Sequence, residues 1–179
     1  MPSNKDRLYV ALYVRAGKPK MPGKEDTYHW AFTVGPKKEP REHRGYRYHA
    51  NEKPSVEHGS EFFYQESDCR NASNMLLVRI VIGKVTNRAR LLEIMRNNPV
   101  ENGQPGWNCV SWIQQGLEML QYDNTALGTS VLDWETVRDE AMGYCQRKKD
   151  THRFDGKGDI FDIMKPPTYD LMERRELQA

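Results

Sequence analysis

The feature that most constrains the fold is a two-residue alternation of side-chain character through the first half of the chain. Within residues 27–35, three large apolar residues alternate with smaller or more polar ones. This alternation is typical of β-strands, whose successive side chains point to opposite faces of a sheet. The pattern predicts strands over five segments: Arg7–Arg15, Thr27–Gly35, Gly45–Ala50, Glu61–Glu66 and Met75–Val85.

Apolar residues in the second half of the chain recur at the three- and four-residue spacing of a helix. They predict helices over Asn87–Asn97, directly after Asn108 and directly after Asp133. Asn and Asp side chains accept hydrogen bonds from the first turn of a helix, so Asn108 and Asp133 are the predicted N-caps. Because the strands precede the helices, we expect an α+β fold in which an antiparallel sheet packs against helices.

The length of 179 residues suits one domain with a sizeable core. We expect this domain to span residues 1–152. The paired Pro166-Pro167 and the charged end of the chain indicate that residues 153–179 are a C-terminal extension. Such a segment is expected to pack loosely or to be partly mobile.

Charge and cysteine content narrow the classes of protein to which the chain can belong. The 27 basic and 25 acidic residues give a net charge of +2, too balanced to indicate nucleic acid or an anionic membrane as a partner. No apolar run is long enough for a membrane anchor, and the first residues do not form a signal peptide. Three widely spaced cysteines argue against a disulfide framework, so we expect a cytoplasmic protein with reduced thiols.

Cys109 differs from the other cysteines because it directly follows the predicted cap Asn108. At the start of a helix, unpaired backbone N–H groups and the positive end of the dipole stabilise a thiolate, which is a nucleophile. The alternative interpretation is that Cys109 is a small buried hydrophobic residue. Cys145 falls on an apolar helical stripe and is assigned to the core, whereas Cys69 is assigned to a loop.

Two histidines fall on predicted strands, His29 on the second and His49 on the third. If these strands form a hairpin in which His29 is opposite His49, the polar and small residues of both strands share one face. A slip of two residues would keep the faces but separate the histidines. We expect the pair to form part of a catalytic cluster, with two unrelated surface histidines as the alternative.

Three short motifs together resemble a known family: His29-Trp30-Ala31-x-x-Val34-Gly35, Tyr46-x-x-His49 and Asn108-Cys109. They are similar to the circularly permuted papain-like fold of the NlpC/P60 superfamily, in particular its lecithin:retinol acyltransferase and H-Rev107-type branch. The sequence is also similar to small uncharacterised fungal proteins. The resemblance implies that Cys109 is the nucleophile, that His29 is its general base, and that His49 orients His29.

This set of residues predicts a thiol-dependent acyl hydrolase or acyltransferase. The thiolate would attack an acyl carbonyl of a small-molecule, lipid-like or aminoacyl substrate and form a thioester. Water as acceptor would make the protein a hydrolase, and an amine or alcohol would make it a transferase; neither reaction needs a cofactor. Four further residues are predicted to line the substrate cleft: Tyr28, Arg47, Trp107 and Asn108.

Three other functions are compatible with the same residues. A permuted papain-like cysteine peptidase or isopeptidase has the same order of histidine and cysteine along the chain. Two histidines and a cysteine could instead hold zinc, although no closely spaced ligand pair supports a metal site. A non-catalytic binding module on the same fold would tolerate loss of the reactive thiolate.

Overall fold

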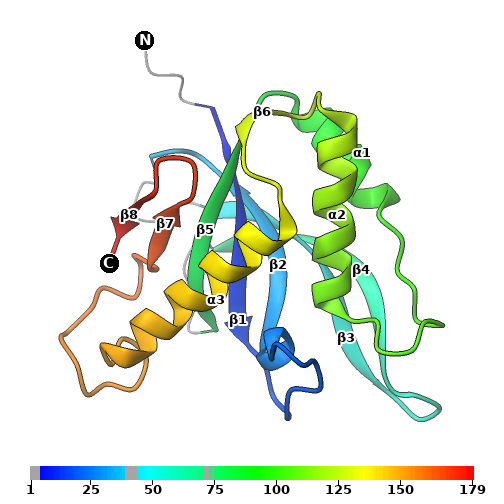
Figure 1. Ribbon diagram of the computed structural model, residues 1–179, viewed down its shortest axis with the longest axis horizontal. Helices are drawn as coiled ribbons and strands as arrows, with labels where there is room; N and C mark the ends of the chain where they lie inside the picture. The colour runs from blue at the N-terminus through cyan, green and yellow to red at the C-terminus, as the bar shows by residue number, and fades with distance from the viewer. Residues whose placement is uncertain (1–4, 39–43, 71–72, 74) are drawn as a thin grey trace.

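The structure is a computed structural model that describes residues 5–38, 44–70, 73 and 75–179. In this part of the chain the fold is mixed α/β, with an open eight-stranded sheet and three α-helices (Figure 1). The strands are β1 (Arg7–Val14), β2 (Tyr28–Gly35), β3 (Arg44–Ser55), β4 (Gly59–Arg70), β5 (Leu76–Val85), β6 (Leu127–Ser130), β7 (Thr168–Asp170) and β8 (Arg175–Gln178). The helices are α1 (Arg88–Asn97), α2 (Cys109–Asp123) and α3 (Trp134–Asp150), and a short 3-10 helix, η1 (Glu25–Thr27), precedes β2.

The strands follow the order β4-β3-β2-β1-β5-β7-β8, and β6 also pairs with β5. Neighbouring strands are antiparallel except for β5 and β7, which run parallel. The sheet is therefore mainly antiparallel, as predicted. The central strands β1 and β5 are buried almost throughout, in agreement with their nearly continuous apolar sequences.

One face of the sheet packs against the helices and forms the main core. Figure 1 shows α3 crossing β1, β2 and β5, while α1 and α2 lie together beside it. Aromatic residues of β2 contact both helices: the ring centroid of Trp30 is 5.6 Å from that of Trp134 in α3, and that of Phe32 is 5.8 Å from that of Trp112 in α2. The alternation of β2 therefore directs its larger side chains toward the helices.

The opposite face of the sheet carries a second, smaller apolar cluster, formed by Ala11, Tyr13, Ala31 and Leu76. The ring of His29 lies 6.3 Å from the ring of Tyr13, centroid to centroid, and the guanidinium of Arg47 lies 5.3 Å from the centroid of the Tyr13 ring. This face therefore combines a small apolar cluster with titratable and cationic side chains.

The predicted strands and helices are all present, but β3 and β4 are longer than expected. They pair residue by residue from Arg44 opposite Arg70 to Ser55 opposite Gly59. The assignment of Cys69 to a loop is wrong, because Cys69 lies in β4 opposite Gly45. The backbone ladder with β3 extends this strand beyond its alternating apolar segment, which the local pattern alone does not reveal.

The end of the chain does not pack loosely where it forms β7. Thr168 and Asp170 are buried, and β7 pairs with β5. The buried guanidinium of Arg79 donates to the Thr168 hydroxyl oxygen over 3.0 Å from Nη2. Residues 168–178 thus contribute two strands to the sheet formed by the preceding residues. The expectation of loose packing is wrong for these residues. The boundary at residue 152 stays a prediction.

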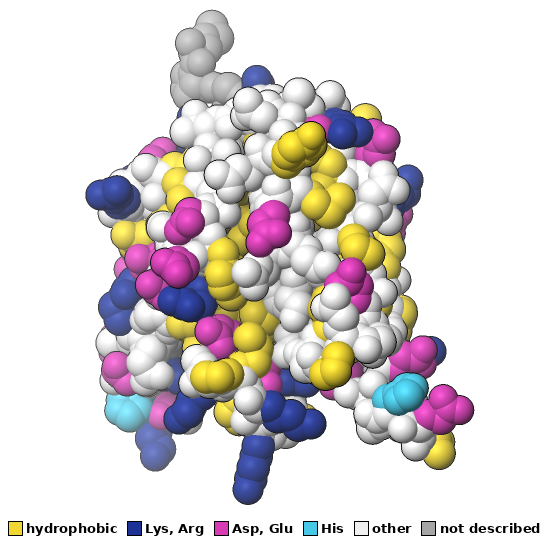
Figure 2. All heavy atoms as spheres, turned by 45° about the vertical axis from the view of Figure 1, so that its right-hand side comes forward, with side chains coloured by type: hydrophobic (Ala, Val, Ile, Leu, Met, Phe, Trp, Pro, Cys, Tyr) yellow, Lys and Arg dark blue, Asp and Glu magenta, His cyan; other side chains and the backbone are white. Residues whose placement is uncertain are grey.

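The surface agrees with the balanced composition. On the face that Figure 2 presents, acidic and basic side chains are interspersed, with hydrophobic side chains between them. Among the described residues, no helix is both long and apolar enough to cross a membrane.

Candidate active site

Cys109 is the first residue of α2, and its position depends on the cap formed by Asn108. The Asn108 side chain accepts hydrogen bonds from the backbone N–H of Val110 and of Ser111, and the Ser111 hydroxyl accepts one from the Asn108 N–H. This is the reciprocal arrangement of a capping box. The cap therefore accepts hydrogen bonds from two N–H groups of the first turn, and the N–H of Cys109 is not one of them.

The thiol of Cys109 is completely buried, at 0% exposure. Burial raises its pKa to about 11, while a hydrogen bond from the backbone of Trp30 and the charge of Arg15 act in the opposite direction. In this conformation the thiol is protonated at neutral pH. Its hydrogen bond with the backbone of Trp30 places Cys109 against β2. Trp30 is the residue that follows His29 in the chain.

The predicted register between β2 and β3 is wrong by two residues. The structure pairs Thr33 with Arg47 and Phe32 with Tyr48, whereas the prediction paired Arg47 with Ala31. Both registers keep the same side chains on each face, so alternation could not distinguish them. The observed pairing ends at Phe32, and the first half of β2 is bordered by β1 and by the start of α2.

The two histidines lie together in spite of the shifted register. His29 Nε2 is 2.6 Å from His49 Nδ1, and the two rings meet edge to face. Diagonal neighbours in a sheet remain within reach of large side chains, which explains why the slip does not separate them. The prediction that both histidines share one face of the sheet is therefore confirmed.

The polar contacts of the pair continue into β3 and β4. His49 Nε2 is 3.1 Å from Gln65 Oε1, which also accepts a hydrogen bond from Asn51 Nδ2 over 2.9 Å. Burial lowers the pKa of His29 to about 4, and the nearby positive charges of Arg47 and Arg15 lower it further. Burial likewise lowers the pKa of His49 to about 3, so both imidazoles are neutral at neutral pH.

Cys109 contacts β2 at the backbone of Trp30, the residue that follows His29. The helix face of β2 carries Trp30, whereas His29 points to the face of Tyr13. Among the described residues, no hydrogen bond joins the thiol to either imidazole. The described side chains also include no group of three His, Cys, Asp or Glu arranged to hold a metal ion, so the zinc arrangement is not assembled.

The four predicted cleft residues have different positions. Trp107 is buried, donates from Nε1 to Gln115 Oε1 over 2.9 Å and stacks edge to face on Phe62, so it packs the core. Asn108 is the helix cap, and Arg47 lies over Tyr13 on the histidine face. Tyr28 lines a cavity.

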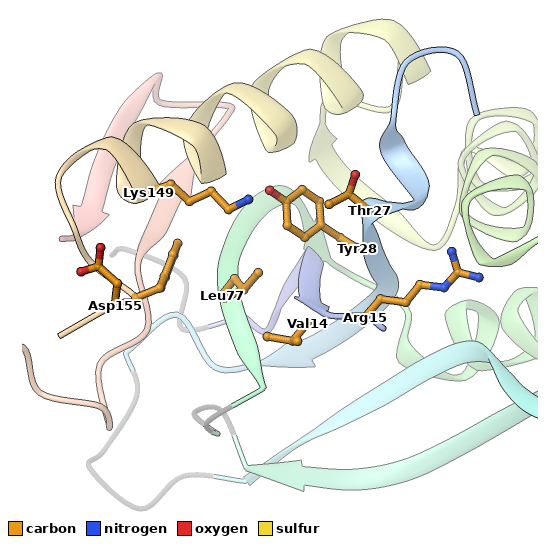
Figure 3. A pocket seen from close by; sticks show the side chains of 8 residues that line it. Val14, Arg15, Thr27, Tyr28, Leu77, Lys149 and Asp155 are labelled. Atoms are coloured by element: carbon orange, nitrogen blue, oxygen red, sulfur yellow. The ribbon is translucent and has the colours of Figure 1, made fainter. Parts of the chain in front are cut away.

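This cavity has a volume of about 370 Å³ and lies between the start of β2, the end of α3 and the segment after α3. Figure 3 shows the ammonium group of Lys149 pointing toward the phenol of Tyr28. Lys149 Nζ lies 5.1 Å from the centroid of that ring. The cavity is lined by Val14, Arg15, Thr27, Tyr28, Leu77, Lys149, Phe154 and Asp155.

Arg15 connects this cavity to the cysteine and histidine region. It lines the cavity, and its charge acts on both Cys109 and His29. Its guanidinium is held by Glu52, with Nε and Nη2 each within 3.1 Å of a carboxylate oxygen, and by the backbone carbonyl of Asp26. Arg15 therefore links this cavity to the candidate site.

Local sequence patterns do not identify four residues of this region: Gln65, Asn51, Arg15 and Lys149. Gln65 lies directly opposite His49 in the β3–β4 ladder. Extending the third strand through its turn into the fourth would have identified this pairing. The cavity residues come from distant segments that a local pattern does not bring together.

Comparison with known proteins yields a family and no named function. No curated protein and no solved structure matches the chain. The model of one family, described as a family of unknown function, matches residues 5–178, which includes β7 and β8. Because this match covers nearly all of the sequence, the chain belongs to the family of unknown function DUF6914.

Proposed function

We propose that the protein is a cysteine-nucleophile acyl hydrolase or acyltransferase with a permuted papain-like arrangement of its site. The observation that carries the proposal is the position of Cys109 on the first turn of α2, hydrogen-bonded to the backbone of Trp30 beside His29. His29 is in turn bonded to His49 over 2.6 Å. A nucleophile, an adjacent base and a group that orients the base are the three parts of a nucleophilic site.

The proposed reaction proceeds in two steps. His29 accepts the thiol proton while Cys109 Sγ attacks the acyl carbonyl, and the leaving group departs with that proton, which leaves a thioester. Water, an amine or an alcohol then attacks the thioester, gives its proton to His29 and releases the acyl product. The proton returns to Cys109, and the free enzyme is restored.

In the proposed starting state both the thiol and the imidazole are neutral, because burial raises the pKa of Cys109 and lowers that of His29. The proton therefore moves during the attack rather than before it, as in sites that use general-base catalysis. The approach of His29 to Sγ runs through the region beyond Phe32 and Tyr48, where β2 and β3 are no longer paired. The N–H of Cys109, which the helix cap does not use, is the proposed oxyanion donor.

The cavity lined by Tyr28 and Lys149 supports a substrate with an apolar part and an anionic group. Val14, Leu77 and Phe154 supply apolar surface, and the Lys149 ammonium supplies positive charge. A small acyl compound that carries a carboxylate or phosphate meets both conditions. A peptidase or isopeptidase remains the alternative within the same chemistry.

A second candidate function is a non-catalytic binding module. One observation favours it: the Cys109 side chain has 0% exposure, so a substrate reaches the thiol only after local rearrangement. A structural cysteine in the core would have the same burial. The two functions differ in whether the thiol can be acylated.

The test is to trap an acyl-enzyme. The protein is incubated with p-nitrophenyl acetate, quenched in acid and examined by peptide mass spectrometry. We expect one acetyl group on Cys109, removable with hydroxylamine as a thioester is, and much less acetylation in His29→Ala. Cys145→Ala, which alters another buried cysteine, is the matched control and should be acetylated like the wild type. Absence of acetyl-Cys109 in the folded wild type would favour the binding module.

A further inference from the structure

We propose that Asn51 and Gln65 are positioning residues that fix the tautomer of both histidines and leave His29 Nδ1 as the proton acceptor of the site. The inference rests on the proposed function for the use of that nitrogen, whereas the tautomers themselves follow from the hydrogen bonds. Four consecutive contacts carry it, from the backbone of Glu52 to the ring of His29.

The series of contacts begins at a backbone N–H, which can only donate a hydrogen bond. The backbone N–H of Glu52 donates to Asn51 Oδ1 over 2.9 Å, which identifies the oxygen of the Asn51 amide. Its other terminal atom is therefore the nitrogen, which donates to Gln65 over 2.9 Å. The receiving atom of Gln65 must then be its oxygen, Oε1.

The same oxygen determines the proton on His49. Gln65 Oε1 has no hydrogen to give, so His49 Nε2, 3.1 Å away, must be the donor. A neutral imidazole carries one N–H, so His49 Nδ1 has a free lone pair. That lone pair faces His29 Nε2 over 2.6 Å, and His29 Nε2 must therefore carry the proton. His29 Nδ1 is left unprotonated.

The surroundings keep both rings neutral. Burial lowers the pKa of each histidine, and the charges of Arg47 and Arg15 oppose protonation of His29, while Glu52 favours it. Near pH 7 the pair therefore holds two ring protons, one on each Nε2. The basic nitrogen that remains available is His29 Nδ1, and a thiol proton can be accepted there.

The first test reads the tautomers directly in the wild-type protein. Long-range ¹H–¹⁵N correlation spectra at pH 7 distinguish protonated from unprotonated ring nitrogens, with signals assigned from His29→Gln and His49→Gln. We expect the Nε2–H form for both His29 and His49. A protonated Nδ1 on His29 would overturn the proposal, whatever the chain's catalytic activity.

The second test reverses the direction of the contacts by a nearly isosteric change. In Asn51→Asp the group facing Gln65 can only accept, so the Gln65 amide should turn its nitrogen toward both residue 51 and His49. His49 would then be protonated on Nδ1, and so would His29. We expect both ¹⁵N patterns to reverse and the rate of Cys109 alkylation at pH 7 to fall about tenfold or more, since the acceptor is lost.

A matched double variant separates this effect from the added charge. Asn51→Asp combined with Gln65→Met carries the same charge but lacks the amide that transmits the reversal. We expect the uniform Nδ1–H pattern to disappear in the double variant; persistence of that pattern would assign the effect to charge and overturn the proposal. If the wild type has the expected tautomers but Cys109 cannot be acylated, the proposed function fails while the tautomer assignment stands.

Discussion

At the scale of single residues, the candidate site consists of neutral, buried groups. His29 and His49 share a hydrogen bond of 2.6 Å, and Cys109 lies against the backbone of Trp30, the residue after His29. Burying an ionised group without a partner is costly, so a buried histidine stays neutral and a buried thiol stays protonated. At rest the candidate site therefore holds a neutral thiol and neutral imidazoles rather than a charged pair.

The neutral histidines make folding stability depend on pH in a defined direction. Burial lowers the pKa from 6.5 to about 4 for His29 and to about 3 for His49. Between pH 6.5 and the lowered pKa values, the histidines of the unfolded chain bind protons that those of the folded chain do not. The free energy of unfolding therefore falls as pH falls from about 6.5 to 4.

We expect His49→Gln to reduce this acid-induced loss of unfolding free energy by on the order of 2 kcal/mol. The measurement is urea unfolding at half-unit steps of pH, compared with the wild type. His58→Gln, at an exposed position on the β3–β4 turn, is the control and should reproduce the wild-type profile. Parallel profiles for all three proteins would contradict the neutral buried pair.

At the scale of elements, the position of Cys109 depends on how closely α2 packs on β2. Gly116 allows this approach, because a Cβ atom there would lie 2.7 Å from Phe32 Cε2. Trp112 of α2 also packs on Phe32, with ring centroids 5.8 Å apart. The helix is thus held against the strand that carries His29.

We expect Gly116→Ala to lower the free energy of unfolding by about 1–3 kcal/mol, because the new methyl group overpacks against Phe32. In Gly143→Ala the nearest atom is Nη1 of the flexible Arg147 side chain, at 3.4 Å. This control should gain about 0.5–1 kcal/mol from the higher helix propensity of alanine. Denaturant unfolding of both variants measures the difference, and a gain for both would contradict the close packing of α2.

At the scale of the whole molecule, the sheet is completed by the end of the chain. β7 runs parallel to β5, and the buried Arg79 donates to the Thr168 hydroxyl, which itself donates to the carbonyl of Pro166 over 2.8 Å. These contacts connect the last residues to a central strand. Residues 168–178 are therefore part of the same sheet as the central strands.

We expect Thr168→Val to lower the free energy of global unfolding by about 2 kcal/mol, because a hydrogen bond to a buried charge is lost. Thr168→Ser keeps the hydroxyl and should cost less. Urea unfolding monitored by tryptophan fluorescence reports on the main core. No change in that transition for Thr168→Val would mean that the C-terminal strands are independent of it.

Local patterns predicted the elements of this fold better than the contacts between them. Alternation identified β1, β2 and β5, and side-chain chemistry identified the caps Asn108 and Asp133. The short strand β7 has no pattern of its own, because it is stabilised by pairing with β5 rather than by local propensity.

For the candidate site too, local patterns predicted some features and not others. Shared faces of β2 and β3 predicted that His29 and His49 would meet, although the register was displaced by two residues. The complete burial of Cys109 and the role of Gln65 depend on contacts between distant strands and helices. No motif near Cys109 encodes them.

The pH dependence of alkylation of Cys109 with iodoacetamide measures whether His29 activates Cys109. Peptide mass spectrometry follows this cysteine alone, in the wild type and in His29→Ala. We predict that the wild-type rate reaches its plateau well below pH 8, where His29 is already neutral. In His29→Ala the rate should rise only toward the thiol pKa, which burial raises to about 11. Identical profiles for the two proteins, or a thiol inert in both until the chain unfolds, would mean that His29 does not activate Cys109.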